Sequence, residues 1–445
     1  MCRQMVGAFL LYAALTVTSH GAANTDLGNG FINAAGPGYV APTLPIGTPC
    51  DSSTPSSLDA TTAIGTAIGD VAGMGGGIVY VPTGTYCLKT HLNVLSNVTL
   101  RGSSDSPPDR GAGIPIAGTV LLAIEGKGST TGNPFIFLSS GATLEGVTIY
   151  YPEQTLPTGS TFTPILYPFA IRGVENTSIQ NVMLWNPYMG VDLATSSSGR
   201  HRIKGLYGQP LLLGVKVDRS LDVGRIDEVH FFPFWSATNT AVENWQRSYA
   251  TAFVFNRCDL EEVSHVFAIN YAVGAWFDVG SPSNLGCAGT FTDVKFDFVA
   301  EGLHVQGTSP IGVTFSQLYV NVIPYNFAQN AIRKVGVGGQ VANINVSQAT
   351  FIGQPSQAIL WDGAGTITVR NSVFQTFLSG APAIQLTGSG GTALVQDNQF
   401  AGAIAGTPAI SIPVAASRSM FTGNSLYGST VVNASPTFLQ ANNLP

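Results

Sequence analysis

The sequence predicts an all-β fold, a single-stranded parallel β-helix of about twelve coils. Two observations point to it. Short segments that read apolar, any residue, apolar recur at intervals of mostly about 20 to 31 residues, and a fixed period of this size is typical of a solenoid. Within each segment the apolar residues alternate with other residues, which indicates strands rather than helices. Because one repeat cannot bury its own apolar face, the coils are expected to stack and share one core.

Each unit of the repeat has a strand half and a bend half. The bend half places a polar residue or Gly between apolar positions. Such residues accept tight turns and hydrogen-bond along a stack, so we interpret them as bend residues and not as metal ligands. No metal site is expected, because zinc-like Cys/His spacings, phosphate loops and nucleophile elbows are absent from the sequence. The bend residues are Asn181, Gly205, Glu228, His265, Asp293, Gln317, Gln348, Asn371, Asp397 and Gly423.

The N-terminus predicts export. Residues 1–23 have the features of a signal peptide: a positive charge at Arg3, an apolar core from Val6 to Val17, and small residues at 21–23 for cleavage. The apolar run is too short to span a bilayer, and no later stretch qualifies, so we expect a secreted or periplasmic protein without a membrane partner. Residues 24–57 are then an N-terminal arm, and residues 58–445 are one β-helix domain with a cap helix and a C-terminal tail.

Four cysteines remain after removal of the signal peptide, an even number in an oxidising compartment. A Cys50–Cys87 disulfide would tie the arm to the first coil. A Cys258–Cys287 disulfide would join one coil to the turn of the next, because each of these cysteines follows one of two successive strands. Free thiols are the alternative.

A helix is expected at the start of the domain, over Leu58 to Ala72. Its apolar residues Ile64, Ile68 and Val71 lie on one face, and it would cover the open strand edges that end a β-helix. It leads through Gly75-Gly76-Gly77 into a strand and the Pro-x-Gly-x-Tyr turn of residues 82–86.

This arrangement resembles the N-terminal part of the pectate-lyase superfamily, in the branch related to glycoside hydrolase family 28. The resemblance covers about residues 58–103, and this chain lacks the acidic Gly-Asp-Gly-x-x-Asp-Asp run usual before the helix. It implies a right-handed β-helix whose repeated strand lines a substrate groove with its outward side chains. By alternation, the outward side chains form two columns. Ionisable and aromatic residues cluster in the middle coils: Arg172, Asp192, Lys216, Trp276, His304 and Arg333 in the first column, and Asp218, Asn256 and Asp278 in the second.

These columns contain carboxylates at spacings that suit glycoside hydrolysis. Asp192 and Asp218 would lie about 8 Å apart, and Asp218 and Asp278 about 10 Å apart. Inverting glycosidases separate their acid and base by roughly 6.5–9.5 Å. Lys216 would keep Asp192 ionised as a base or nucleophile, whereas Asp218 beside Asn256 would carry the proton as the acid. The alternative is that these are ordinary exposed charges in weak cross-strand pairs.

Two insertions are expected to wall the groove. The segment between Glu228 and His265 carries Trp235, Trp245 and Tyr249 and should overhang the groove, while Tyr150 to Tyr167 should wall the neighbouring side. Sugar rings stack on such aromatic side chains, although some could simply pack the loops. The expected substrate-binding residues are Arg172, Trp235, Trp245, Tyr249, Asn256, Trp276 and Arg333.

The charge distribution bears on the substrate. The net charge of −6 argues against nucleic acid as a partner. A local basic zone nevertheless suggests a carboxylated or sulfated sugar near one end of the groove. Alternatively, these cations pair with Glu175, Asp222 and Asp227. The zone holds seven of the 19 Lys and Arg residues: Arg172, Arg200, Arg202, Lys204, Lys216, Arg219 and Arg225.

The leading functional hypothesis is a secreted glycoside hydrolase that degrades a polysaccharide, possibly an acidic one, without a cofactor. The first alternative is a polysaccharide lyase, in which Lys216, His304 or Arg333 abstracts the proton next to a uronate and Asp218 with Asp278 holds Ca²⁺. The second is a non-catalytic, glycan-binding surface protein. A polygalacturonase mechanism cannot be carried over, because Gly-His-Gly and an adjacent Asp pair are missing and the Arg-Ile-Lys run at 202–204 lies outside the groove strand.

Overall fold

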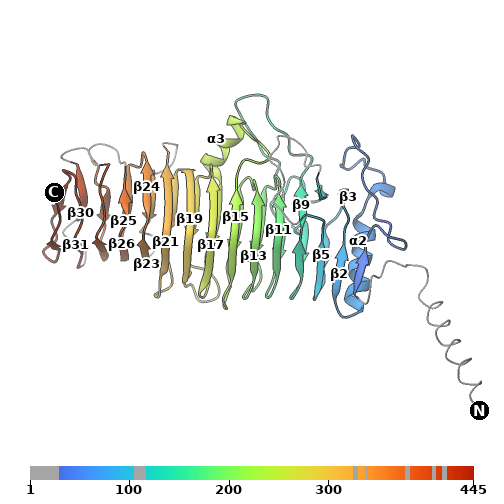
Figure 1. Ribbon diagram of the computed structural model, residues 1–445, viewed down its shortest axis with the longest axis horizontal. Helices are drawn as coiled ribbons and strands as arrows, with labels where there is room; N and C mark the ends of the chain where they lie inside the picture. The colour runs from blue at the N-terminus through green and yellow to red at the C-terminus, as the bar shows by residue number, and fades with distance from the viewer. Residues whose placement is uncertain are drawn as a thin grey trace, which may run out of the picture.

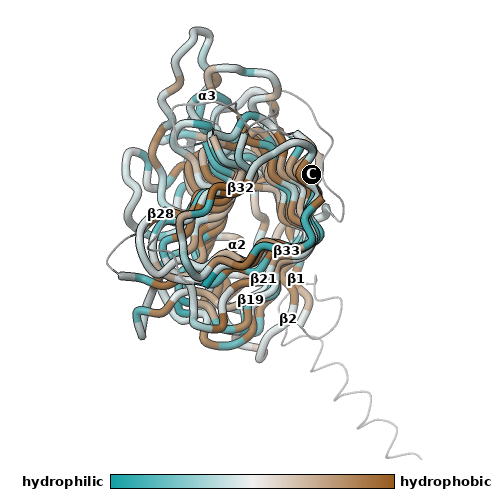
Figure 2. The backbone as a smooth tube through the Cα atoms, turned by 90° about the vertical axis from the view of Figure 1, so that its left-hand side faces the viewer, coloured by the Kyte–Doolittle hydropathy of each residue, from teal (hydrophilic) through white to brown (hydrophobic). Residues whose placement is uncertain are grey.

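The chain folds into an elongated rod of stacked parallel strands, with its two ends at opposite ends of the rod (Figure 1). This is a computed structural model, and it describes residues 30–104, 117–323, 329–336, 339–375, 381–402, 407–412 and 418–444. The signal peptide expected at residues 1–23 lies outside the described residues. Viewed along the rod, successive coils superpose around a common axis (Figure 2). The predicted parallel β-helix is confirmed.

One wall of the rod is a 13-stranded parallel sheet, called sheet B here. It takes one short strand from each coil, and each strand pairs with those of the preceding and following coils. Its strands are β4 (Leu92–Val94), β7 (Ile136–Leu138), β10 (Phe169–Gly173), β12 (Met189–Leu193), β14 (Leu213–Val217), β16 (Thr251–Phe255), β18 (Val273–Phe277), β20 (Glu301–Val305), β22 (Asn330–Lys334), β25 (Gln357–Asp362), β28 (Ile384–Thr387), β30 (Pro408–Ile412) and β32 (Thr430–Asn433).

The remaining wall is a bent, 20-stranded sheet, called sheet A. Its strands are β1 (Phe31–Asn33), β2 (Gly77–Tyr80), β3 (Gly84–Leu88), β5 (Val98–Arg101), β6 (Thr119–Ala123), β8 (Thr143–Glu145), β9 (Val147–Tyr150), β11 (Ser178–Leu184), β13 (Arg202–Gly208), β15 (Arg225–Phe231), β17 (Glu261–Ile269), β19 (Gly289–Val299), β21 (Val313–Val322), β23 (Ala342–Ser347), β24 (Thr350–Gly353), β26 (Gly365–Arg370), β27 (Val373–Phe374), β29 (Gly391–Gln396), β31 (Met420–Thr422) and β33 (Leu439–Ala441).

The bend of sheet A runs along the polar column found in the sequence. All ten bend residues, from Asn181 to Gly423, have a left-handed backbone with φ between 49° and 71°. Some coils continue through the bend as one strand, as β11 does across Asn181, whereas others break into two strands, as β23 and β24 do on either side of Gln348. The sequence interpretation of this column as a structural bend is therefore confirmed. Gly and Asn occupy this conformation most readily, and the other residues are held in it by the paired strands on both sides.

The core is a ladder of inward apolar side chains from both sheets. In the middle coils the aromatic rings continue the ladder, with Phe253 stacked on Phe231 at 5.5 Å between ring centres and Phe255 stacked on Phe277 at 5.4 Å. These four side chains are at most 1 % exposed. Burial of each such ring stabilises the fold by about 1.5–3 kcal/mol, so the stack of coils is held together along its whole interior.

Three helices accompany the strands in the described residues: a short 3-10 helix η1 (Ser56–Leu58), α2 (Thr61–Gly73) and α3 (Thr240–Tyr249). None of the helices in this part of the chain is long and apolar enough to cross a membrane. Helix α2 is the expected cap: it buries Ile64, Ala67, Ile68 and Val71 against the first coil. The Gly run that follows it is needed because the chain at the start of β1 lies close to it, and a Cβ at Gly77 would clash with the carbonyl oxygen of Gly30.

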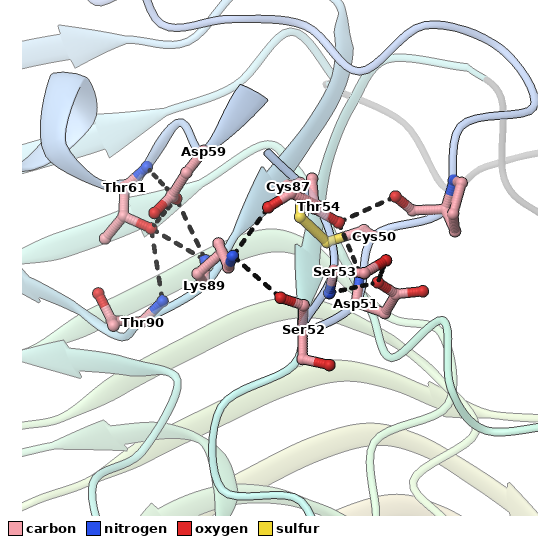
Figure 3. The surroundings of a disulfide bond; sticks show 11 residues. Cys50, Asp51, Ser52, Ser53, Thr54, Asp59, Thr61, Cys87, Lys89 and Thr90 are labelled. Atoms are coloured by element: carbon pink, nitrogen blue, oxygen red, sulfur yellow. Dashed lines mark hydrogen bonds between the residues drawn. A yellow bond between two sulfur atoms is a disulfide. The ribbon is translucent and has the colours of Figure 1, made fainter. Parts of the chain in front are cut away.

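Both predicted disulfides are present. Cys50 and Cys87 join the N-terminal arm to β3, with their Cα atoms 5.5 Å apart, and Cys258 and Cys287 join two successive coils, with their Cα atoms 4.4 Å apart. Around the first disulfide, the ammonium of Lys89 donates to the backbone carbonyl of Thr54 at 2.8 Å (Figure 3). The arm is thus held to the first coil by a covalent bond and by charge-assisted hydrogen bonds.

Candidate functional site

The outer face of sheet B carries the predicted first column. The cross-strand partners run from Arg172 through Asp192, Lys216 and Val254 to Trp276, and then to His304 and Arg333. Each step joins one coil to the next, about 4.8 Å away. The register predicted from alternation is therefore correct, and these side chains share one face of the rod.

The second column stacks just beyond the strand ends. The backbone N–H of Asp218 donates to the carbonyl of Leu193, and the N–H groups of Asn256 and Asp278 donate in the same way to the preceding coils. Asp218, Asn256 and Asp278 thus occupy equivalent places on three successive coils. Two coils separate the carboxylates, which corresponds to about 10 Å between their Cα atoms.

Asp192 differs from the expected catalytic base. It is only 1 % exposed, and its carboxylate accepts four hydrogen bonds, from Arg172 Nε at 2.6 Å, from Thr195 Oγ1 at 2.6 Å, and from the backbone N–H groups of Ala194 and Thr195. Burial opposes ionisation, but the hydrogen bonds from Thr195, Arg172 and the two amides outweigh it and lower the pKa of this carboxyl. All of its acceptor sites are occupied, so Asp192 has no free lone pair for a substrate or water. In the structure, Asp192 is a buried carboxylate that holds the turn at Ala194 and Thr195 by these hydrogen bonds.

The cation that neutralises Asp192 was also predicted incorrectly. Lys216 is the cross-strand partner of Asp192, but the ion pair of Asp192 is with Arg172 on the opposite neighbouring strand. In the part of the chain that the structure describes, Lys216 has no ion pair and is half-buried. Lys216 is therefore free to meet a substrate group, whereas Arg172 is committed to Asp192.

Two further carboxylates, Asp218 and Asp278, converge on one turn at the end of sheet B. Asp218 Oδ1 accepts from the backbone N–H groups of Arg219, Arg257 and Ser281, the last at 3.1 Å, whereas Oδ2 has only a 3.4 Å contact with the Ser281 N–H. Asp278 accepts from the N–H of Val279, and the amide of Gln306, oriented to donate, lies 2.7 Å from its Oδ2. Both carboxylates are half-buried and bound to residues 279–281. Neither forms an ion pair within the described residues.

A cleft of about 520 Å³ opens beside this turn. It begins at Val279, the residue after Asp278. Its wall mixes amide and hydroxyl side chains with apolar ones, a combination that suits the hydroxyl edges and apolar faces of sugar rings. The lining residues are Val279, Asn284, Leu285, Thr308, Pro310, Gly339, Gln340, Val341 and Asn343.

A second polar cluster lies on β20 and β22. Glu301, only 1 % exposed, accepts from Arg333 at 2.8 Å and contacts His304 Nδ1 at 2.6 Å. The ring of Trp276 covers the ring of His304, with 3.8 Å between their centres. His304 Nε2 is buried without a hydrogen-bond partner among the described residues. His304, Arg333 and Trp276 are thus brought together as the columns predicted.

Sequence analysis missed Glu301. It lies one position before the repeated strand pattern, where the neighbouring coils carry Val273 and Asn330. Strict alternation would place Glu301 and His304, which are three residues apart, on opposite faces of the strand. Gly302 turns inward at the corner and interrupts the alternation, so the two side chains lie on the same face. The one available signal was a carboxylate at a position that is apolar in the preceding coil.

Comparison with known proteins places the fold. Residues 54–153 match the family model described as rhamnogalacturonase A/epimerase, pectate lyase-like. The solved structure of DFA-IIIase from Arthrobacter chlorophenolicus A6 without its lid superposes with a TM-score of 0.51 at 12% identity, over 94% of this chain and 100% of that chain. Residues 54–153 are thus similar to this family, and the likeness to the solved structure is one of fold, a right-handed parallel β-helix.

A looser likeness is to the catalytic domain of a GH87 alpha-1,3-glucanase in complex with nigerose, with a TM-score of 0.43 at 14% identity, over 91% of this chain and 70% of that chain. Among curated proteins, the comparison found no match to this chain.

In this β-helix, the two insertions form one wall instead of two. Helix α3 ends at Tyr249 and leads directly into β16, at the edge where the chain passes from sheet A to sheet B, and it projects from the rod (Figures 1 and 2). Phe162 of the other insertion packs against Trp235 and Trp245, with ring centres 6.0 and 5.9 Å apart. The expectation of walls on two sides was therefore wrong.

The aromatic residues of this wall have different exposures. Trp235 is 3 % exposed and packs the interior of the wall, so it is not the sugar contact that the sequence suggested. Trp245 is half-buried between Tyr188 and Tyr249. Tyr249 is 63 % exposed at the end of α3. Tyr249 is therefore the residue of this set that can meet a ligand without rearrangement.

The calcium site considered for a lyase would use Asp218 and Asp278. Among the described residues, no group of three or more His, Cys, Asp or Glu side chains is arranged to hold a metal ion. Ca²⁺ takes six to eight oxygen ligands, and Asp218 and Asp278 already accept hydrogen bonds from backbone and amide donors. The calcium site considered for a lyase therefore lacks a preformed ligand set there.

Proposed function

We propose that this protein is a secreted glycoside hydrolase that degrades a polysaccharide at the strand ends of sheet B, with Asp218 and Asp278 as its catalytic carboxylates. The observation that carries the proposal is that these two half-buried side chains, without ion-pair partners in the described chain, are bound to the same turn beside a sugar-sized cleft. Their spacing of about 10 Å between Cα atoms is near the roughly 6.5–9.5 Å that inverting enzymes use between carboxyl groups.

The hydrogen bonds suggest which carboxylate does which task. Three backbone N–H groups converge on Asp218 Oδ1, while Oδ2 has only a 3.4 Å contact and can accept a hydrogen bond from a water molecule. Asp218 is thus suited to act as the base that activates water. Asp278, bound to one backbone amide and one side-chain amide, is the candidate acid that protonates the leaving oxygen. Asp218, which the sequence predicted to be the acid, is thus proposed as the base, and Asp278 takes the role of the acid.

Two further observations support a glycan substrate and export. The family model matched by residues 54–153 carries the names of a rhamnogalacturonase and an epimerase. The two disulfides fit an oxidising compartment, as a secreted or periplasmic protein would meet. Polar amides in the cleft and Trp276 on the same face supply the hydrogen bonds and apolar surface that hold a sugar.

A polysaccharide lyase is the second candidate, and the Glu301–His304 contact favours it. A carboxylate on Nδ1 fixes the tautomer that leaves Nε2 as a base, in the manner of a catalytic dyad. Arg333 beside it would neutralise a uronate carboxylate. In this arrangement Trp276 covers the ring, so proton abstraction would require Trp276 to swing away from His304.

A glycan panel distinguishes these functions. Hydrolysis yields new reducing ends without ultraviolet absorbance, whereas elimination yields an unsaturated uronide that absorbs. The Asp218→Asn and Asp278→Asn variants should abolish the hydrolytic product, and His304→Gln should leave it nearly unchanged. Elimination product that depends on His304 would support the lyase instead. Glycan binding with no turnover on the whole panel would identify a non-catalytic binding protein.

A further inference from the structure

A second cleft lies on sheet A, away from the groove face, and it is basic. Its volume is about 520 Å³, and it lies over β13, β15 and β17, which are neighbours in the middle of the rod (Figure 1). Arg202, Lys204 and Arg225 are exposed on this face. We call these three residues and their surroundings the sheet A basic cleft. The cleft is lined by Arg200, His201, Arg202, Ile203, Lys204, Arg225, Ile226, Asp227, Glu262 and Ser264.

The strand register places like charges side by side. Arg202 on β13 is the direct cross-strand partner of Arg225 on β15, about 4.8 Å away, and Lys204 lies two residues along the same strand as Arg202. Like charges directly opposite each other destabilise a sheet. A bound anion that bridges Arg202 and Arg225 would remove this repulsion.

The anionic neighbours are already engaged. Glu262 pairs with Arg225 at 2.9 Å, and Asp227 accepts from Ser264 and contacts His265 Nδ1 at 2.8 Å. The other Arg of the cleft, Arg200, pairs with Asp222 at 2.7 Å and with Glu175 at 3.5 Å. The charge pairing considered from the sequence therefore applies to Arg200. Arg225 is also paired, but with Glu262, which was not among the expected partners.

Arg202 and Lys204 are different. Neither forms an ion pair within the described residues, although the whole protein has a net charge of −6. Both side chains are exposed and line the cleft. On β15, Lys204 has Asp227 as its cross-strand partner, without an ion pair to it, whereas Arg202 has only Arg225 there. Free cationic donors in a shallow cleft are the usual means of holding carboxylate or sulfate groups.

We propose that the sheet A basic cleft is a second glycan-binding site, which holds the carboxylate or sulfate groups of an acidic polysaccharide outside the catalytic groove. Only Arg172, Lys216 and Arg219 of the basic zone belong to the groove side, so the zone expected near one end of the groove is divided between two faces. This proposal does not depend on the hydrolase proposal. A polysaccharide fits better than nucleic acid, because the site has only two uncommitted cations and no exposed aromatic ring among its lining residues for base stacking.

The test measures binding of the full secreted protein to polygalacturonate, to dextran sulfate and to neutral dextran, by affinity electrophoresis. The Asp278→Asn background prevents consumption of the probes. We expect salt-sensitive binding to the two anionic polymers and little binding to neutral dextran. Replacement of both free cations, Arg202→Ala with Lys204→Ala, should weaken this binding about tenfold or more.

The matched control is Arg370→Ala. Arg370 is an exposed cation on the same sheet and in the same register column as Lys204, several coils further along, with Ser347 and Gln396 as neighbours. The Arg370→Ala variant should bind the anionic polysaccharides as tightly as the wild type does. Unchanged binding by the double variant, an equal loss in Arg370→Ala, or duplex DNA bound as tightly as the anionic polysaccharides would each overturn the proposal. Equal thermal midpoints of all variants exclude unfolding as the cause.

Discussion

Arg172 Nε lies 2.6 Å from Asp192 Oδ2, and this ion pair links two adjacent coils beneath the outer surface of sheet B. The Asp192 side chain is 1 % exposed and that of Arg172 is 20 % exposed. A buried pair of this kind is costly to break from one side, because the partner is left with an uncompensated charge. We therefore expect Asp192, the outward carboxylate beside Lys216, to stabilise the fold and not to take part in catalysis.

The Asp192→Asn variant tests this assignment. We expect the free energy of unfolding to fall by about 3 kcal/mol, because Arg172 loses its counter-ion and the turn loses a charged acceptor. Turnover per folded molecule should stay near the wild-type value. Denaturant unfolding and activity titrated against folded protein measure the two effects. A stable variant without activity would show that Asp192 is a catalytic residue.

A buried histidine makes stability depend on pH. His201 is 1 % exposed, and its Nε2 lies 2.8 Å from Glu261, which is fully buried. Burial lowers the pKa of His201, but the charge and hydrogen bond of Glu261 outweigh it, so the net shift is upward from 6.5. A raised folded pKa means that the stabilisation is fully present below about pH 6.5 and is lost as the pH rises through the folded value.

The measurement is the thermal midpoint of wild type and His201→Gln over a range of pH. The difference between them should be largest at mildly acidic pH and should shrink as the pH rises. A difference that grows with pH would show that His201 is held neutral in the folded protein.

The N-terminal disulfide should contribute strongly to stability. Cys50 and Cys87 close a loop of 37 residues, and chain entropy predicts a loss of about 4 kcal/mol when the Cys50→Ser, Cys87→Ser double variant removes the bond. Calorimetry under non-reducing conditions checks this value. A loss below about 1 kcal/mol would mean that the hydrogen bonds of Lys89 and the packing of α2 hold the arm without the bond.

The left-handed bend offers a stabilising substitution. Gln317 has φ of 58° and an exposed side chain, so its Cβ costs roughly 1–2 kcal/mol that Gly would avoid. Gln317→Gly should therefore raise the free energy of unfolding by up to about 1 kcal/mol after the entropy cost of Gly. The control is Thr314→Gly on the same strand, an exposed position outside the bend, which should destabilise the protein. Equal losses in both variants would contradict the role assigned to the bend.

The fold and the register followed from the sequence because a β-helix makes both properties local. Alternation fixes which side of a strand each residue faces, and the constant coil length sets its neighbours. This is why Asp192, Lys216, Trp276, His304 and Arg333 were placed correctly in one row. The same logic found the bend, since only a few residue types tolerate a positive φ.

The partners of individual side chains did not follow. Each outward residue has a neighbour on either side, and alternation does not tell whether Asp192 pairs with Arg172 or Lys216. Nor does it tell that Trp235 packs inside the wall, since that depends on where Phe162 of a distant insertion lies. Glu301 was missed because the corner at Gly302 interrupts the alternation. Loop packing and corner geometry are tertiary effects, which a repeat pattern does not encode.

The chemistry that we propose for the end of sheet B is acid–base catalysis by Asp278 and Asp218. Its most direct test is kcat of Asp278→Asn on the glycan found with the panel, with the thermal midpoint measured in parallel. We predict a fall of about 10²–10⁴-fold in kcat, the range for loss of a general acid, at an unchanged midpoint. Turnover within about tenfold of wild type, in a variant that is folded and binds the glycan, would contradict the account.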